Sequence, residues 1–384
     1  MTSPTTHPTY MIVNLDALKQ NVREVRRRVG NETKIIASVK ANAYGHGIVP
    51  IARSLSSAGV EMLATGSFED AVKIREAGIS IPILMFGALL PSAIDDFSKF
   101  GLTPTIHNKE TAQVITNGVK TTTSIFIKVD CGFGRLGIPI GEAHRFVTDI
   151  ARQPNIQVIG LYTHLPFFDE AGYKWACERI SKFDAFVKQL FDEGLTIPFT
   201  EARASAAIVS GIQDDCTSVS PGGILYGHSP VVEGLGDTSG FGSVLESLRT
   251  RLIHIAHGTN DSMSGGKGLY AARMEGLTGV VPFGRSDGNR TAATGESAHM
   301  LLNGKKLPIL GVSLEHCILD LSAAKQAQVG DEVVILGSCN DAKITLAQMA
   351  AWWGAGINDV LMALNGRIRQ KFLPDHVENN VERP

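Results

Sequence analysis

A lysine followed by small residues and glycines is the first group in the sequence that could do chemistry. Lys40 stands at the end of a predicted strand and precedes the run ANAYGHG of residues 41–47. If this strand belongs to a parallel barrel, its last side chain points into the barrel mouth, where partial burial favours the neutral amine that forms Schiff bases. The spacing alone leaves open a second interpretation, a solvated lysine at a strand end.

A second cluster combines an arginine with glycines and an internal lysine. Arg135 follows another predicted strand, in the run VDCGFGRLG of residues 129–137. The glycines let the backbone approach a ligand, and a guanidinium can bind a carboxylate through two parallel hydrogen bonds. Lys128 lies inside the strand, where a buried cation is unfavourable unless it is paired or modified. The run therefore predicts an anion-binding corner.

An imidazole and a glycine-rich turn complete the set. His164 ends a predicted strand, although a lone histidine there is more often a hydrogen-bonded structural group. Ser205 follows the seventh predicted strand, and Ser220 and Gly222 precede the eighth. Barrels commonly hold phosphate at this place, between serine and glycine amides. An amine, a guanidinium, an imidazole and a phosphate cradle around one mouth suit pyridoxal phosphate (PLP).

These groups must be positioned by a regular alternation of strands and helices. The first two-thirds of the chain shows it, beginning with a helix whose apolar residues, from Leu15 to Val29, are spaced by three and four. Eight alternations predict an α/β fold with a closed parallel (β/α)8 TIM-type barrel, which carries its functional groups at the carboxyl ends of the strands. The predicted strands are residues 34–39, 62–65, 81–86, 103–106, 124–129, 157–162, 199–202 and 223–225.

The rhythm changes after about residue 240, where short β-rich segments alternate with Gly, Asn and Asp turns. This pattern is typical of a mostly-β domain. We therefore expect the PLP-binding barrel in residues 10–238, followed by a C-terminal mostly-β domain in residues 239–384 that also includes residues 1–9. The clearest strands predicted there are residues 252–256, 278–281, 307–312, 317–321 and 332–336, with one helix near 344–353.

Composition excludes several classes of protein. The chain has 384 residues, and 36 Lys+Arg against 38 Asp+Glu leave a net charge of −2, which argues against a nucleic-acid partner. Hydrophobic residues make up 43%, too many for a disordered chain, yet no apolar run is long enough for a membrane helix. The first residues lack the pattern of a signal peptide, so we expect a cytoplasmic protein. Five widely spaced cysteines argue against disulfides and a zinc site, and we expect no metal.

The motifs that carry the chemistry resemble one known family. Residues 39–47, VKANAYGHG, closely resemble the PLP-lysine motif of alanine racemases. Residues 128–137 and 160–164 resemble the same family, while residues 221–227 and 284–288 match it more loosely. The resemblance covers nearly the whole chain. It implies a fold-type III PLP enzyme, with a barrel, a β domain, an amino-acid substrate and a homodimer whose active sites are shared.

The resemblance assigns cofactor-binding roles residue by residue. It implies that Lys40 holds PLP as an internal aldimine and acts as the base on one face of the substrate Cα. Tyr44 is expected to contact the phosphate, together with Ser205 and the backbone of Gly222. His164 is expected to lie against the pyridine ring.

The resemblance also assigns the groups that meet the substrate. Arg135 is expected to reach the phenolic oxygen of PLP and the substrate carboxylate. Lys128 corresponds to a lysine that is often carbamylated in this family and then holds the arginine. Glu315 falls where the family has the acid of its Met-Asp motif, and we count it among the catalytic candidates.

The sequence departs from the family at three positions. Gly266 falls where the family has its second catalytic base, a tyrosine, and only a gap of four residues would move Tyr270 into that slot. Ser220 replaces the arginine that faces the pyridine nitrogen. Gly366 replaces a tyrosine near the C-terminus. Because both glycines remove phenols, they predict a widened substrate pocket.

Three functions remain open. The first is an amino-acid racemase or epimerase acting at Cα through a Lys40 Schiff base, with a substrate larger than alanine and His164, Tyr270 or Glu315 as the second acid/base. The second is a PLP-dependent decarboxylase or aldolase-type lyase, because such reactions need only one face of the substrate. The third is a non-catalytic PLP-binding protein, against which the complete second domain counts.

Overall fold

The protein divides into two compact units, which are described separately. A computed structural model describes residues 8–87, 90–258, 276–290, 292, 298–364 and 366–374. One unit comprises residues 15–43 and 47–244, and the other comprises residues 1–14, 44–46 and 245–384.

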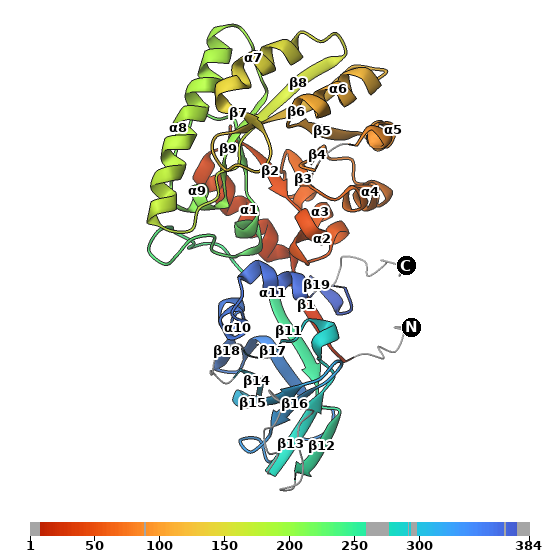
Figure 1. The fold of residues 1–384 in the computed structure, drawn as a ribbon. Coiled ribbons are helices and arrows are strands. Elements are labelled where there is room, and N and C mark those ends of the chain that lie inside the picture. Colours follow the sequence, from red (N-terminus) through yellow and green to blue (C-terminus); the bar gives the residue numbers. More distant parts are fainter. Residues whose placement is uncertain are drawn as a thin grey trace. The chain divides into compact units, whose positions relative to one another are not determined.

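The first unit is a parallel barrel, which confirms the predicted fold class. Parallel neighbours run from β5 through β4, β3, β2, β10, β9 and β8 to β6, and a β5–β6 pairing closes the ring (Figure 1). A two-residue strand, β7 (Ile138–Pro139), lies beside β6. The barrel strands are β2 (Lys34–Ser38), β3 (Met62–Thr65), β4 (Ile83–Met85), β5 (Leu102–Ile106), β6 (Thr123–Asp130), β8 (Ile156–Tyr162), β9 (Phe199–Ala204) and β10 (Ser218–Ser220).

The eighth strand was predicted in the wrong place. Residues 223–225 lie in a 3-10 turn, Gly223–Tyr226, whereas the strand that closes the barrel is β10, Ser218–Ser220. Gly227 ends this turn in a left-handed conformation with a φ of 81°. The apolar run ILY attracted the prediction, but its side chains are buried by the turn. Ser220 therefore ends the last strand instead of preceding it.

Helices follow the strands and cover the outside of the barrel (Figure 1). Several begin at a side-chain cap: Ser67 accepts a hydrogen bond from the Asp70 amide, Asn108 from that of Thr111, and Asp169 from that of Gly172. The helices of this unit, apart from the left-handed turn α2 (Lys40–Tyr44) described below, are α1 (Leu15–Val29), α3 (Ile48–Ser57), α4 (Phe68–Glu76), α5 (Ile94–Lys99), α6 (Lys109–Gly118), α7 (Ile140–Ala151), α8 (Glu170–Asp192) and α9 (Ser205–Val209).

Aromatic and aliphatic side chains form a small buried cluster of their own. Its buried members are Ile36, Met62, Ala64, Leu84, Phe126 and Tyr162. Phe126 packs directly over the backbone of Gly160, its partner on the neighbouring strand β8. A Cβ at residue 160 would lie 2.1 Å from the Phe126 ring. This glycine is therefore needed for packing.

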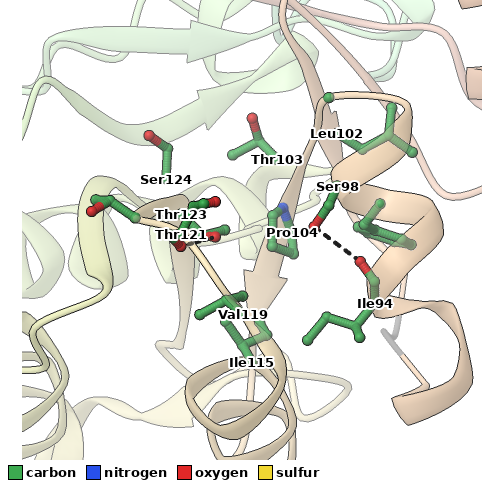
Figure 2. A pocket seen from close by; sticks show the side chains of 13 residues that line it. Ile94, Ser98, Leu102, Thr103, Pro104, Ile115, Val119, Thr121, Thr123 and Ser124 are labelled. Carbon is green, nitrogen blue, oxygen red and sulfur yellow. Dashed lines mark hydrogen bonds between the residues drawn. The ribbon is translucent and has the colours of Figure 1, made fainter.

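The barrel wall parts at the amino end of β5 and β6. These two strands pair at Thr105–Phe126 and Ile106–Ile127. Below these pairs, a cavity of about 260 Å³ opens between them (Figure 2). Its floor includes Ile94, Ile115 and Val119, and the hydroxyl-bearing residues 121–124 form much of its rim.

The second unit is mostly β, as the sequence predicts. Its sheet runs in the order β12-β13-β16-β15-β14-β17-β11-β1-β19, with β18 beside β17. The strands are β1 (Tyr10–Asn14), β11 (Leu245–Arg251), β12 (His254–Gly258), β13 (Gly276–Val281), β14 (His299–Leu302), β15 (Lys305–Val312), β16 (Cys317–Asp320), β17 (Glu332–Cys339), β18 (Ala342–Ile344) and β19 (Arg369–Leu373). Two helices, α10 (Leu346–Trp353) and α11 (Ile357–Ala363), accompany them.

The N-terminal boundary of the barrel differs from the expected residue 10. Residues 10–14 form β1, which pairs with β11 and β19 in the second unit. Their side chains alternate between half-buried and buried, as in a strand with one face on a core. The barrel unit itself begins with α1 at Leu15.

Two other sequence features can be placed. No helix among the described residues is long and apolar enough to cross a membrane. The five cysteines are free thiols, and Cys131, Cys216 and Cys317 are buried.

Replacing Gly160 by alanine should destabilise the barrel. Because the new methyl group would overlap the Phe126 ring, we expect G160A to lower the free energy of unfolding by about 1–3 kcal/mol, measured by urea denaturation. G141A is the matched control, since nothing lies within 4 Å of a Cβ at this position in α7. Equal stability of both variants would contradict the packing argument.

Candidate active site

Lys40 begins an unusual left-handed turn directly after β2. Residues 41–44 have φ values between 52° and 55°, although none is a glycine. The turn carries a hydrogen bond from the Ala43 amide to the Val39 carbonyl at 3.1 Å. For L-amino acids this conformation costs about 1–2 kcal/mol per residue, and such strain is found mostly at functional sites.

Side-chain hydrogen bonds hold this turn in place. The backbone N–H of Asn42 donates a hydrogen bond to the side-chain carboxylate of Asp70, in α4, at 2.9 Å. The side-chain oxygen of Asn42 accepts a hydrogen bond from the Ile48 amide at 2.8 Å, at the start of α3. The turn is thereby fixed to the helices that flank it. The turn fixes the position of Lys40, whose Nζ lies 5.8 Å from the centre of the Phe86 ring.

Lys128 is buried within β6, as the sequence indicated. Its Nζ lies 5.6 Å from the centre of the Tyr162 ring. Burial, together with repulsion by Arg135 and Lys40, lowers the pKa of Lys128 to about 8. Attraction by Glu201 and Asp130 opposes this shift. The effects show that Lys128, Lys40 and Arg135 share one region of the barrel.

The loop that carries Arg135 is organised around one carboxylate. Asp130, the last residue of β6, accepts hydrogen bonds from the amides of Gly132 and Phe133 at 2.8 Å and from that of Gly134 at 3.0 Å. Gly132 and Gly134 have φ values of 122° and 73°, which favour glycine. The loop therefore presents the Arg135 guanidinium, with Cζ 4.9 Å from the centre of the Phe133 ring.

His164 follows β8 and lies among these cations. Burial, followed by repulsion from Lys40, Lys128 and Arg135, lowers the pKa of His164 to about 3. The imidazole is therefore neutral at physiological pH. It makes an edge-to-face contact with Phe133, with ring centres 5.6 Å apart.

Glu201, a buried carboxyl group in β9, was not predicted from the sequence. Tyr162 is paired with Lys128 on one side and with Glu201 on the other, so the three residues occupy one level of adjacent strands. Burial and repulsion by Asp214 raise the pKa of Glu201 well above its usual range, while Lys128 and Lys40 oppose the rise. A charged residue within a buried strand was the available signal, as it was for Lys128.

The predicted phosphate cradle lies at the ends of β9 and β10. The Ser205 hydroxyl oxygen accepts hydrogen bonds from the amides of Gly222, at 2.8 Å, and Ile224, at 3.4 Å. The Ser205 proton therefore remains able to point to a ligand. The Gly222 amide thus binds the Ser205 hydroxyl, the neighbouring group of the predicted cradle.

The remaining candidates fall in the second unit or outside the described residues. Glu315 accepts a hydrogen bond from Arg367 at 3.3 Å, and Arg367 also lies 3.8 Å from Asp287. Gly366 is exposed, and its φ is 91°. Tyr44 groups with this unit by its contacts, although it follows Lys40 closely in sequence.

Gly266 and Tyr270 lie outside the described residues. The structure therefore assembles Lys40, Lys128, Arg135 and His164 at one end of the barrel, together with the unforeseen Glu201.

The two units match two family models. The model described as "Alanine racemase, N-terminal domain" matches residues 13–230, and "Alanine racemase, C-terminal domain" matches residues 245–372. Together they account for most of the chain and place it among PLP-dependent racemase-type enzymes.

Individual relatives agree. An alanine racemase of Halothermothrix orenii is 31% identical over 377 residues, covering 96% of this chain and 97% of the relative. An alanine racemase of Desulforamulus reducens is 28% identical, covering 95% and 99%. The chain belongs to the alanine racemase family.

Solved structures support the same assignment. The alanine racemase of Clostridium difficile has a TM-score of 0.86 at 25% identity, with 96% of each chain covered. That of Bacillus anthracis with bound L-Ala-P has a TM-score of 0.86 at 26% identity, covering 97% of this chain and 96% of the other.

The His164 pKa can be tested by titration. We expect the imidazole signals of His164 in an NMR titration to stay those of the neutral ring down to about pH 5, because burial and three cations disfavour its charged form. K128M, which removes one repelling cation, should raise the pKa. Since the unfolded state takes up a proton that the folded state refuses, this group should lower stability as pH falls from 6.5 toward 3. A His164 titration near pH 6.5 would contradict the assignment.

The left-handed turn predicts opposite effects for two substitutions. N42A removes the acceptor for the Ile48 amide and a residue type that tolerates positive φ, so we expect a loss of about 1–3 kcal/mol in the free energy of unfolding. A41G introduces the residue best suited to a φ of 52° and should keep or raise stability. Thermal denaturation measures both, and equal losses would show that the turn stores no strain.

Proposed function

We propose that this protein is an amino-acid racemase or epimerase that acts at Cα with PLP, on a substrate larger than alanine. The observation that carries the proposal is the gathering of Lys40, Lys128, Arg135 and His164 at the carboxyl ends of the barrel strands. The free cysteines support a reducing, cytoplasmic environment. The family assignment supports a homodimer.

The residues present fit the cofactor. PLP is a phosphorylated anion, and the barrel end offers the cationic groups of Lys40, Lys128 and Arg135 together with the Ser205 hydroxyl. When bound, PLP would withdraw electrons from an amino-acid substrate attached to it through the substrate's own amine, which would make the Cα proton acidic and leave Lys40 as a free amine. Lys40 is the residue proposed to carry it, with Tyr44, Ser205, Ser220 and Gly222 as further cofactor-binding residues.

The chain's own residues then divide the remaining work. Lys40 Nζ removes and returns the Cα proton on one face. The guanidinium of Arg135 binds the substrate carboxylate through two hydrogen bonds. His164 would place a neutral imidazole beside the pyridine ring of PLP, because burial and the nearby cations disfavour the charged form of His164. Lys128 either carries a carbamate that holds Arg135, as the family resemblance implies, or remains a cation.

The second acid/base is not His164 in this proposal. A group with a pKa of about 3 is almost never protonated at neutral pH and is a weak base. Tyr270 and Glu315 therefore remain the candidates for the opposite face. If neither acts there, a decarboxylase or aldolase-type lyase becomes the better description, because these reactions need one face only.

The proposed substrate size depends on the replaced tyrosines. Nothing lies within 4 Å of a Cβ built on Gly366, so the space around this residue is open within its unit. Its φ of 91° also disfavours a tyrosine side chain. Both facts support a substrate pocket that lacks the family's tyrosine at this position. Gly266 is proposed to widen the same pocket further.

The decisive experiment follows solvent deuterium into the substrate. The holoenzyme is incubated in D₂O with single enantiomers of alanine and of larger amino acids. The product enantiomers are separated by chiral chromatography, and their deuterium content is measured by mass spectrometry. We expect label at Cα in both enantiomers, with faster turnover of a larger amino acid than of alanine.

K40A is the control, because it should lose both the visible absorbance of lysine-bound PLP and all turnover. Loss of CO₂ or an aldehyde, with one configuration retained, would support the lyase instead. Fast turnover of alanine would contradict the substrate proposal. If the original chain shows the absorbance of lysine-bound PLP but turns over none of the amino acids tested, it is a non-catalytic PLP-binding protein.

A further inference from the structure

Phe133 contacts two of the proposed active-site residues at once. Its ring centre lies 4.9 Å from Cζ of Arg135 and 5.6 Å from the centre of the His164 ring. The planes of the two rings meet at 83°, an edge-to-face contact. Yet 39% of Phe133 is exposed. Burial alone therefore does not explain its position.

The backbone sets the position of this ring. The amide of Phe133 donates to the Asp130 carboxylate at 2.8 Å, between similar hydrogen bonds from Gly132 and Gly134. Further along the loop, Gly137 has a φ of 129°, and a Cβ there would meet the Asp130 amide nitrogen at 2.8 Å. The loop is thus fixed at both ends, and Phe133 projects from a rigid support.

Arg135 needs such a support for electrostatic reasons. It lies in the region of Lys40 and Lys128, whose positive charges repel it. Its own side chain is long and exposed, with many rotamers to lose when it binds a ligand. If Lys128 remains a cation and carries no carbamate, another group must hold the guanidinium and leave its hydrogen-bonding edge available for a substrate carboxylate.

An aromatic face solves this problem without a negative charge. It attracts a guanidinium through the ring quadrupole and leaves the N–H groups free to bind an anion in the guanidinium plane. The same ring meets His164 edge to face, and that imidazole is neutral. One side chain can therefore orient both groups.

We propose that Phe133 is a positioning residue, which orients the Arg135 guanidinium for the substrate carboxylate and aligns the His164 imidazole on the same ring. The inference rests on the proposed function for the identity of the carboxylate ligand. The contacts that it requires do not depend on the reaction that follows.

The test uses holoenzyme variants and propionate, a carboxylate without the amine that would react with the cofactor. F133L keeps an apolar side chain but loses the aromatic face, whereas F133Y keeps that face. F168L is the matched control, since Phe168 is another exposed phenylalanine of the barrel unit, at 63% exposure. The dissociation constant for propionate is measured by NMR titration, alongside the ¹³C-labelled imidazole signals of His164.

We expect F133L to weaken propionate binding by about two- to fivefold, the range for a cation–π contact at an exposed site. Its His164 signals should lose the ring-current shift caused by Phe133. F133Y should match the original chain in both measurements, and F168L should leave both unchanged.

Two results would overturn the proposal. Unchanged propionate affinity in F133L would show that the ring does not orient Arg135. An equal loss in F133L and F133Y would show that only the fit of the phenylalanine matters. Neither measurement requires turnover, so a failure of the racemase proposal in the deuterium experiment is distinguishable from a failure of this one.

Discussion

Repulsion between like charges is the constraint on which the candidate site depends. Lys40, Lys128 and Arg135 share one end of the barrel, and the resulting field suppresses the charge of His164. Such a cluster is unfavourable by itself and becomes favourable when an anion binds between its members. The site is therefore built for a negatively charged partner. A phosphorylated cofactor meets this need.

Backbone devices hold the cations where packing alone could not. The strained left-handed turn places Lys40, and the amides gathered by Asp130 place Arg135. Lys128 needs no such device, since its strand fixes it. The strained turn is held by helices α4, which accepts a hydrogen bond from it, and α3, which donates one to it. The fixed backbone around Lys40 and Arg135 thus keeps these side chains close together although their charges repel each other.

The sequence predicted most of this arrangement, and its failures have physical causes. Strand ends identified Lys40 and His164, and the glycine spacing identified Arg135, because these signals are local. The eighth strand was misplaced because β10 has three residues and the apolar run beyond it is buried in a turn. Glu201 was missed because its significance lies in the neighbours that the barrel brings to it. The roles of Glu315 and Gly366 also depend on spatial neighbours, which spacing along the chain does not give.

The parted wall between β5 and β6 has a consequence for solubility. Where the strands separate, each leaves part of an edge without its neighbour (Figure 2), and free strand edges invite pairing with other chains. Pro104 occupies this stretch of β5 and has no N–H group to offer. Helices α5 and α6 contribute residues to the lining of the cavity between the strands. The barrel can therefore stay open at its amino end without presenting a template for aggregation.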